Sequence, residues 1–307
     1  MSLPRSGPQR ASLAARTRPL CPHPQLEKPP LVDVSLTIAR DTPAVHPRPE
    51  TESYTFHTAE LVRKNILRRG GPPDSDSPAP ERPLRVLDLC TGTGCIALLL
   101  HALLVPHYPH MAVLGIDLST AAIELANRNL EHNLQRGLLS SRARSEVHFR
   151  RGNVLGDQSS GVPGVEEVLR DVSRRGCPLD STLPAQGDPE WDVLISNPPY
   201  ISPSSFRDGT TARSVRIFEP TLALVPPTGV RDPEARNCSQ GDLFYHRIVA
   251  LSFKLRPRLS VLECGDRVQA ERVVAICRGF MEDLSDRSHI DVYPSADEGD
   301  VSQAQVG

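Results

Sequence analysis

The sequence predicts an α/β fold built on a doubly wound, mostly parallel sheet with helices on both faces. From residue 85 onward, short apolar runs typical of buried strands alternate with segments of helical periodicity. Several of these runs end at Gly, Asp or Asn, at the strand ends where parallel sheets bind ligands. The 307-residue chain has a net charge of −2, which argues against a broad basic surface for duplex DNA.

The elements follow one another in a regular order. Six runs have the character of strands: residues 85–89, 111–116, 146–149, 191–196, 259–264 and 288–293. Helical spacing begins at residues 96 and 119, covers 165–172 and 268–278, and places Phe244, Ile248 and Leu251 on one face. Strands joined through helices require right-handed crossovers and parallel pairing. No apolar stretch approaches the ~18 residues of a membrane span, so no membrane insertion is expected.

The chain divides into four parts by composition. Residues 1–30 are expected to be a disordered or transit-like tail, because the first 26 residues contain arginines but no acid, while their prolines oppose an amphipathic helix. Residues 31–84 are expected to be an N-terminal linker segment. Residues 85–295 form the main domain, with an inserted loop at 156–190, and 296–307 a second tail. The first tail predicts a mitochondrial location, with the cytoplasm as the alternative.

A glycine-rich loop follows the first predicted strand. Gly92 and Gly94 let the backbone turn sharply and let a ligand approach closely. A P-loop is excluded because no Lys-Ser/Thr follows Gly94, and the dinucleotide fingerprint fails because Cys90 replaces its first glycine. Asp117 ends the second strand, where its carboxylate can accept hydrogen bonds from ribose hydroxyls, or can merely cap a helix. Together these residues predict a ribose-containing cofactor.

The segment Asn197-Pro198-Pro199-Tyr200 directly follows the fourth predicted strand. Two successive prolines fix the backbone and remove two N–H donors, so the turn presents unpaired carbonyls. The Asn197 side-chain oxygen and the Pro198 carbonyl can each accept one N–H of a substrate NH₂ group. Tyr200 offers a flat face for a planar amide or base. The alternative, a local turn, is disfavoured by the position at a strand end.

These motifs resemble the class I S-adenosylmethionine-dependent methyltransferases, which have a Rossmann-like sheet and methylate planar amino nitrogens. Three more segments resemble the HemK/PrmC family of protein glutamine N5-methyltransferases: residues 47–52 (PRPETE), 218–224 (FEPTLAL) and 261–265 (VLECG) with Gln269. The resemblance covers about residues 31–280. The chain departs from the family at Cys90, where glycine is usual, at Asn153, where an acid is frequent, and in a reduced N-terminal extension.

The resemblance implies methylation of a glutamine in the Gly-Gly-Gln loop of a peptide-chain release factor. It implies S-adenosylmethionine as cofactor, the release factor as partner, and no stable nucleic-acid binding. The implied catalytic residues are Asn197, Pro198, Pro199 and Tyr200. The implied cofactor-binding residues are Asp88, Thr91, Gly92, Thr93, Gly94, Asp117, Leu118, Asn153, Val154 and Asn197. The implied substrate-binding residues are Arg48, Glu50, Glu52, Tyr200 and Glu219.

Two alternatives from other classes stay open on the sequence. A nucleic-acid amino-group methyltransferase of the N6-adenine type uses the same Asn-Pro-Pro-Tyr turn on a flipped base. An inactive methyltransferase-fold binding protein keeps the fold without turnover. No metal site is predicted, because the seven cysteines are scattered and have no zinc-ligand spacing.

Overall fold

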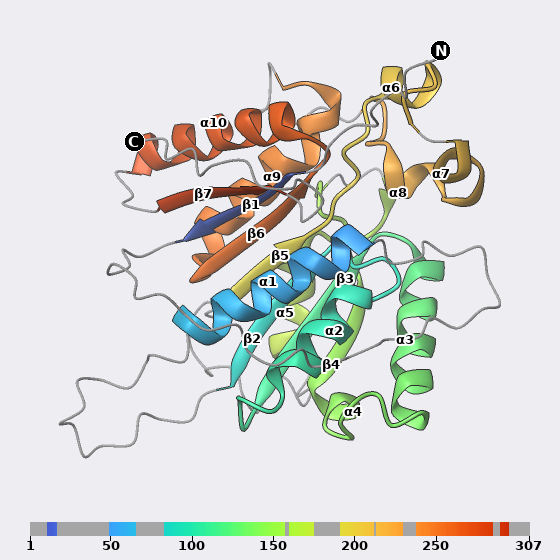
Figure 1. The fold of residues 1–307 in the computed structure, drawn as a ribbon, viewed down its shortest axis with the longest axis vertical. Helices are drawn as coiled ribbons and strands as arrows, with labels where there is room; N and C mark the ends of the chain where they lie inside the picture. Colours follow the sequence, from blue (N-terminus) through green and yellow to red (C-terminus); the bar gives the residue numbers. More distant parts are fainter. Residues whose placement is uncertain are drawn as a thin grey trace, which may run out of the picture.

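The computed structural model describes residues 11–16, 49–65, 83–156, 160–174, 191–211, 213–229, 238–284 and 289–294. Within them, one sheet has the strand order β4-β3-β2-β5-β6-β1-β7 (Figure 1). Five neighbouring strands run parallel: β4 (Val147–Arg151), β3 (Met111–Asp117), β2 (Leu84–Leu89), β5 (Val193–Ser196) and β6 (Leu259–Cys264). These strands lie where the sequence predicts them, so the parallel sheet is confirmed.

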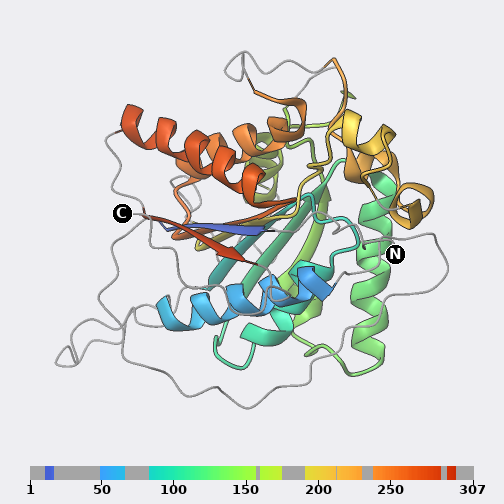
Figure 2. The same cartoon turned by 45° about the horizontal axis from the view of Figure 1, so that its top comes forward.

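Helices cover both faces of the sheet, as Figures 1 and 2 show. Alternate residues of β2 face opposite sides: Leu87 and Leu89 pack into one buried cluster and Val86 into the other. One face carries α5 (Val165–Arg174), α9 (Leu243–Leu255) and α10 (Arg267–Leu284), and the other α1 (Pro49–Asn65), α2 (Cys95–Leu104) and α3 (Thr120–Gln135). This is the doubly wound, Rossmann-like architecture that the sequence predicts.

The first strand in the sequence lies inside the sheet. β1 (Ala11–Arg16) pairs antiparallel with β6 on one side and with β7 (His289–Pro294) on the other. All six residues of β1 have a partner on each side, from Ala11 opposite Cys264 to Arg16 opposite His289. Residues 11–16 therefore form a strand, whereas a disordered or transit-like tail was expected over residues 1–30. The remainder of that range, and 296–307, lie outside the described residues.

Helix α1 occupies part of the segment expected to be a linker. Its buried threonines satisfy their hydroxyls within the helix, since Thr55 donates to the carbonyl of Thr51 at 2.6 Å and Thr58 to that of Tyr54 at 2.8 Å. Leu61 and Val62 are buried in the same cluster as the side chains of α2. The helix is thus a packed part of the domain.

Helix α5 lies within the segment expected to be an inserted loop. Its residues Val165, Val168, Leu169 and Val172 are all buried against the sheet. The helix is therefore the covering element of the crossover between β4 and β5, while residues 157–159 and 175–190 lie outside the described part. The remaining short helices are α4 (Ala143–Glu146), α6 (Pro203–Arg207), α7 (Arg213–Phe218), α8 (Thr221–Leu224) and η4 (Gln240–Asp242).

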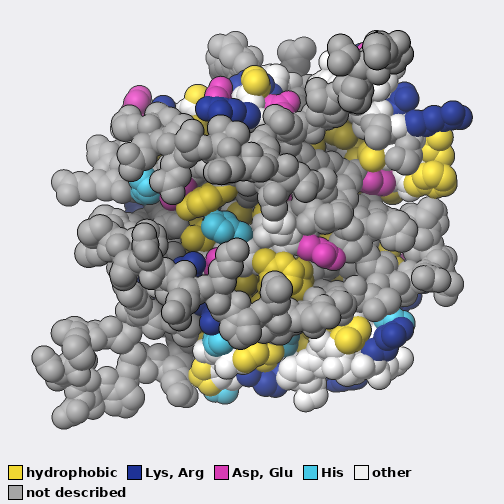
Figure 3. Space-filling view, viewed as in Figure 1, with side chains coloured by type: hydrophobic (Ala, Val, Ile, Leu, Met, Phe, Trp, Pro, Cys, Tyr) yellow, Lys and Arg dark blue, Asp and Glu magenta, His cyan; other side chains and the backbone are white. Residues whose placement is uncertain are grey.

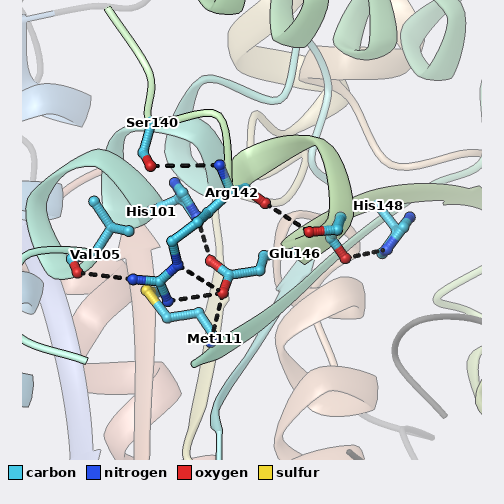
Figure 4. Close-up of polar contacts among 8 residues, drawn as sticks. His101, Val105, Met111, Ser140, Arg142, Glu146 and His148 are labelled. Atoms are coloured by element: carbon cyan, nitrogen blue, oxygen red, sulfur yellow. Dashed lines mark hydrogen bonds and ion pairs between the residues drawn. The ribbon is translucent and has the colours of Figure 1, made fainter. Parts of the chain in front are cut away.

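A polar cluster around Glu146 ties the elements together at the amino ends of β3 and β4 (Figure 4). Its carboxylate lies 2.9 Å from His101 Nε2 of α2, accepts hydrogen bonds from Arg142, the shorter at 2.7 Å, and accepts one from the Met111 amide at 3.3 Å. Burial is the main cause that lowers the pKa of His101. This polar cluster is structural, because it lies at the amino ends of the strands, whereas the candidate site lies at their carboxyl ends.

Candidate active site

The site lies where the order of strands reverses. The chain winds outward from β2 through β3 to β4, then returns to place β5 on the other side of β2. The ends of β2 and β5 are joined, since the Ser196 hydroxyl donates to the Leu89 carbonyl at 2.7 Å. Parallel sheets bind ligands at such a switch point, beyond the carboxyl ends of the strands. The predicted glycine loop and the Asn-Pro-Pro-Tyr turn both begin there.

The glycine loop depends on left-handed backbone conformations. Gly94 has φ 77° and begins α2, and a Cβ there would lie 2.7 Å from the ring of Phe149. Gly92 has φ 55°, and a Cβ there would meet nothing within 4 Å. Cys90 also has a positive φ, of 59°, which costs a non-glycine residue about 1–2 kcal/mol. The position of Cys90 therefore favours the glycine that the family usually has.

Asp88 supplies a buried carboxylate with an unused oxygen. Its Oδ2 accepts a hydrogen bond from the Thr91 hydroxyl at 2.6 Å, whereas its Oδ1 is buried and has no partner among the described residues. Burial, opposed by the Thr91 hydrogen bond, raises the pKa of Asp88 to about 7. A cationic, hydrogen-bonding cofactor such as S-adenosylmethionine fits this oxygen, because it would supply both the charge and the donor that the site lacks.

Asp117 is positioned by backbone amides at the end of β3. Its two oxygens accept hydrogen bonds from the amides of Gly92 at 2.9 Å and Ser119 at 2.8 Å. Burial raises the pKa of Asp117 in spite of these bonds. A carboxylate has about four acceptor positions, so each oxygen keeps one for a ribose hydroxyl. The predicted ribose-binding role is compatible with this arrangement.

The other predicted cofactor residues are buried or half-buried at the ends of β2, β3 and β4. Asn153 is buried, with its Oδ1 accepting the Leu155 amide at 3.0 Å and its Nδ2 donating to Ser160 at 3.1 Å. These two hydrogen bonds hold the side chain in a local turn, and its part in cofactor binding stays a prediction. Val154 and Thr93 are buried, and Leu118 is half-buried.

The Asn-Pro-Pro-Tyr turn has the unpaired acceptors that its sequence predicts. Pro198 and Pro199 are buried, whereas Asn197 and Tyr200 are half-buried. Among the described residues, neither the Asn197 side chain nor the Pro198 carbonyl takes part in a hydrogen bond. Both oxygens therefore keep their full capacity to accept hydrogen bonds.

The predicted substrate-binding residues come from two other elements. Arg48 lies outside the described residues, and the side chain of Glu50 is not described. Glu52 is exposed on α1, whose first turn reaches the end of β6, because the Thr51 hydroxyl donates to Glu263 at 3.4 Å. Glu219 is half-buried between α7 and α8.

An exposed apolar surface lies on α7 and α8. Ile217, Phe218 and Leu222 are 58 %, 66 % and 46 % exposed, and Figure 3 shows apolar and basic side chains side by side at this corner of the molecule. The surface is connected to the site, because the amide of Ile201, next to Tyr200, donates to the carbonyl of Leu224 at 2.9 Å. This hydrogen bond connects the end of α8 to the residue that follows the turn.

Sequence reasoning missed the role of one group of side chains behind the turn. Gln269, Asp242 and Arg272 form a hydrogen-bonded group that reaches the Tyr200 carbonyl. The only signal in the sequence is the spacing of Gln269 after Gly265, which by itself assigns no contact.

The structure describes no helix long and apolar enough to cross a membrane, and no cluster of metal-ligand side chains among its described residues.

Comparison with known proteins shows which proteins the chain resembles. No family model matches the chain. The Release factor glutamine methyltransferase of Chlorobaculum tepidum is 33 % identical over 183 residues, 60 % of this chain and 46 % of that protein. The probable MRF1 mitochondrial N(5)-glutamine methyltransferase of Schizosaccharomyces pombe is 28 % identical over 240 residues, covering 75 % and 59 %. The hMettl16 catalytic domain, solved with an RNA hairpin, aligns with a TM-score of 0.44 at 17 % identity, over 81 % of this chain and 68 % of that one.

The structural likeness is too low to bear on function, so the fold class rests on the strand order itself. The sequence matches are more informative about function than the structural ones, although the chain spans about half the length of the curated relatives it matches. The chain is therefore similar in sequence to the release factor glutamine methyltransferases of the HemK/PrmC family, as its motifs predict.

Proposed function

We propose that this chain is an S-adenosylmethionine-dependent enzyme that methylates the N5 nitrogen of a glutamine side chain in a peptide-chain release factor. One observation carries the proposal: the Asn197 side chain and the Pro198 carbonyl have no hydrogen-bond partner among the described residues, at the switch point beside the glycine loop. A carboxamide NH₂ has two donors, which match these two acceptors in number and type.

The acceptor pair addresses the main difficulty of the reaction. An amide nitrogen is a poor nucleophile because its lone pair is delocalised into the carbonyl. The oxygens of Asn197 and Pro198 accept both N–H donors and hold the nitrogen in one orientation. Such positioning can supply about 7–11 kcal/mol of the barrier reduction. Tyr200 bounds the amide on its flat side, and the proton leaves to solvent after the nitrogen has gained its methyl group.

The cofactor would be held by residues of the first two strand ends. Asp88, Gly92 and Gly94 would bind its amino-acid part and Asp117 its ribose. When bound, S-adenosylmethionine supplies an electrophilic methyl group. The unpartnered Oδ1 of Asp88 and the open space beside Gly92 support this assignment.

A protein substrate is supported by two observations. Relatives are named for release factors, and the helices α7 and α8, which follow the turn, expose Ile217, Phe218 and Leu222, an apolar surface of the kind that docks a macromolecule. Other relatives are named ribosomal protein uL3 glutamine methyltransferases, so uL3 belongs in the test. The net charge of −2 weighs against the nucleic-acid alternative.

We also propose a mitochondrial location. Two fungal relatives are named as mitochondrial enzymes, and the acid-free, arginine-containing start of the chain agrees with import. A fluorescent fusion placed after residue 307 tests this. Co-localisation with a mitochondrial marker is expected, and diffuse cytoplasmic fluorescence would contradict it.

The function is tested by mass spectrometry after incubation with S-adenosylmethionine. A mitochondrial-type release factor, ribosomal protein uL3 and a single-stranded oligonucleotide are offered in parallel. We expect one added methyl group on the glutamine of the Gly-Gly-Gln loop of the release factor. Methylation of the oligonucleotide alone would establish the nucleic-acid alternative, and cofactor binding without transfer to any of the three would establish the inactive one.

A further inference from the structure

Gln269, in the first turn of α10, connects three parts of the site through one buried side chain. Its Nε2 lies 3.3 Å from the carbonyl oxygen of Tyr200, 3.1 Å from that of Gly241 and 3.0 Å from Asp242 Oδ1. Its Oε1 accepts the amide of Gly265 at 2.8 Å. The end of β6, the η4 turn and the last residue of the Asn-Pro-Pro-Tyr turn therefore meet at one amide group.

Asp242 fixes which way this amide points. Its carboxylate also accepts hydrogen bonds from the Ser239 hydroxyl at 2.6 Å and from the Arg272 guanidinium, at 3.0 Å for the second nitrogen. Burial alone would raise the pKa of Asp242, but the bonds from Arg272, Ser239 and Gln269 outweigh it and lower the pKa. A carboxylate cannot donate, so the NH₂ of Gln269 must face it, and the same NH₂ faces Tyr200.

The turn fits closely against this support. A Cβ on Gly265 would lie 2.9 Å from the ring of Tyr200, and one on Gly241 would lie 3.1 Å from the Tyr200 carbonyl. The ring and carbonyl of Tyr200 thus lie against backbone that only glycine allows at these distances. Because the backbone of Gly265 and that of Gly241 pack closely against it, Tyr200 has little freedom to shift.

The two prolines make external support necessary. Pro198 and Pro199 have no N–H, so the middle of the turn can donate no backbone hydrogen bond to its neighbours. It is tied at its two ends instead: the Ser196 hydroxyl bonds Leu89 before it, and Gln269 bonds Tyr200 after it.

We propose that Gln269, oriented by Asp242 and Arg272, is a positioning residue that fixes the Tyr200 end of the turn and so holds the Asn197 and Pro198 oxygens in the geometry for transfer. The inference rests on the proposed function of the turn. It assigns Gln269 no contact with cofactor or substrate. Its removal therefore affects the rate of transfer and leaves cofactor affinity unchanged.

The test compares Gln269→Met with Gln240→Met. Gln240 is a matched control, because its Nε2 also bonds backbone carbonyls, those of Pro226 and Pro227, without contacting the turn. For Gln269→Met we expect kcat for the release factor to fall by about 100-fold, the effect of a misplacement near 1 Å, with the dissociation constant of S-adenosylmethionine unchanged. The control should keep its kcat. Equal losses of kcat in both variants would overturn the inference.

A conservative variant separates positioning from general stability. Gln269→Glu keeps the acceptor for Gly265 but loses the donors when ionised, and regains one when protonated. At a temperature well below unfolding, its kcat relative to the wild type should rise as the pH is lowered. A ratio that does not change with pH would contradict the positioning role. This variant also serves if Gln269→Met does not fold.

A readout without turnover keeps the inference distinct from the proposed function. The chain has five tyrosines, so 3-fluorotyrosine labelling gives a short ¹⁹F spectrum in which Tyr200→Phe assigns the Tyr200 signal. In Gln269→Met or Gln269→Glu that signal should shift or broaden while the Tyr108 and Tyr293 signals stay. An unchanged Tyr200 signal overturns the inference even if the wild type transfers no methyl group, a result that would itself refute only the proposed function.

Discussion

Replacing Asp88 with asparagine removes the most strongly perturbed charge of the site. The carboxylate is fully buried at the end of β2, with one oxygen bonded to Thr91 and the other unpartnered. Burial raises its pKa from 3.8 to about 7. An amide of nearly the same shape cannot ionise, so Asp88→Asn isolates the cost of the buried charge.

The raised pKa sets the sign and the size of the effect. Between about pH 4 and pH 7 the folded protein keeps a proton that the unfolded chain releases, so the free energy of unfolding falls as the pH rises through this range. A shift of about three units at about 1.4 kcal/mol each corresponds to about 4 kcal/mol. The stability of Asp88→Asn relative to the wild type should therefore increase by about 4 kcal/mol between pH 4 and about pH 8.5.

Urea unfolding without cofactor at both pH values measures this difference. The same substitution at Asp171, an exposed aspartate of α5, is the control and should give no such pH-dependent gain. Calorimetry with S-adenosylmethionine should show weaker binding to Asp88→Asn, because the variant lacks the charge that a cationic cofactor neutralises. A difference in stability between wild type and Asp88→Asn that stays constant with pH would refute the buried-charge reasoning.

Three further perturbations follow from the backbone. Gly265→Ala places a Cβ 2.9 Å from the Tyr200 ring and should lower kcat. Gly279→Ala, at an open helical position of α10, is its control and should raise stability by about 0.5–1 kcal/mol without changing kcat. Equal kcat values in the two variants would contradict the close fit of Tyr200 against Gly265. Cys90→Gly should be more stable than Cys90→Ala by about 1 kcal/mol in thermal unfolding, because only glycine relieves the positive φ; an Ala variant of equal or greater stability would show no strain. Deleting residues 1–17 removes the strand between β6 and β7 and should lower the melting temperature, and an unchanged melting temperature would show that the strand is dispensable.

The parallel sheet could be predicted from the sequence because its strands are nearly continuous apolar runs buried on both faces. Their ends carry Gly92, Gly94, Asp117 and Asn197, so the positions of the glycine loop and of the Asn-Pro-Pro-Tyr turn could be predicted as well. The observed strand ends differ from the predicted ones by at most two residues, as at β5, which begins at Val193 where residue 191 is predicted.

Other elements depend on tertiary contacts that no local pattern encodes. Strand β1 lacks β-branched residues and gains its hydrogen bonds from partners some 250 residues away. Helix α1 buries threonines that a sequence pattern assigns to polar surface, because their hydroxyls bond within the helix. The contacts of Gln269 join three segments distant in sequence, so its role emerges only from the fold.

The acceptor pair of Asn197 and Pro198 is tested most directly by Asn197→Ala, measured as methylation of the release-factor glutamine by mass spectrometry at saturating S-adenosylmethionine. The proposed mechanism predicts that the variant binds the cofactor as the wild type does, by calorimetry, and leaves the glutamine unmethylated. Methylation at the wild-type rate, or a loss of activity explained entirely by lost cofactor binding, would contradict the role of the turn.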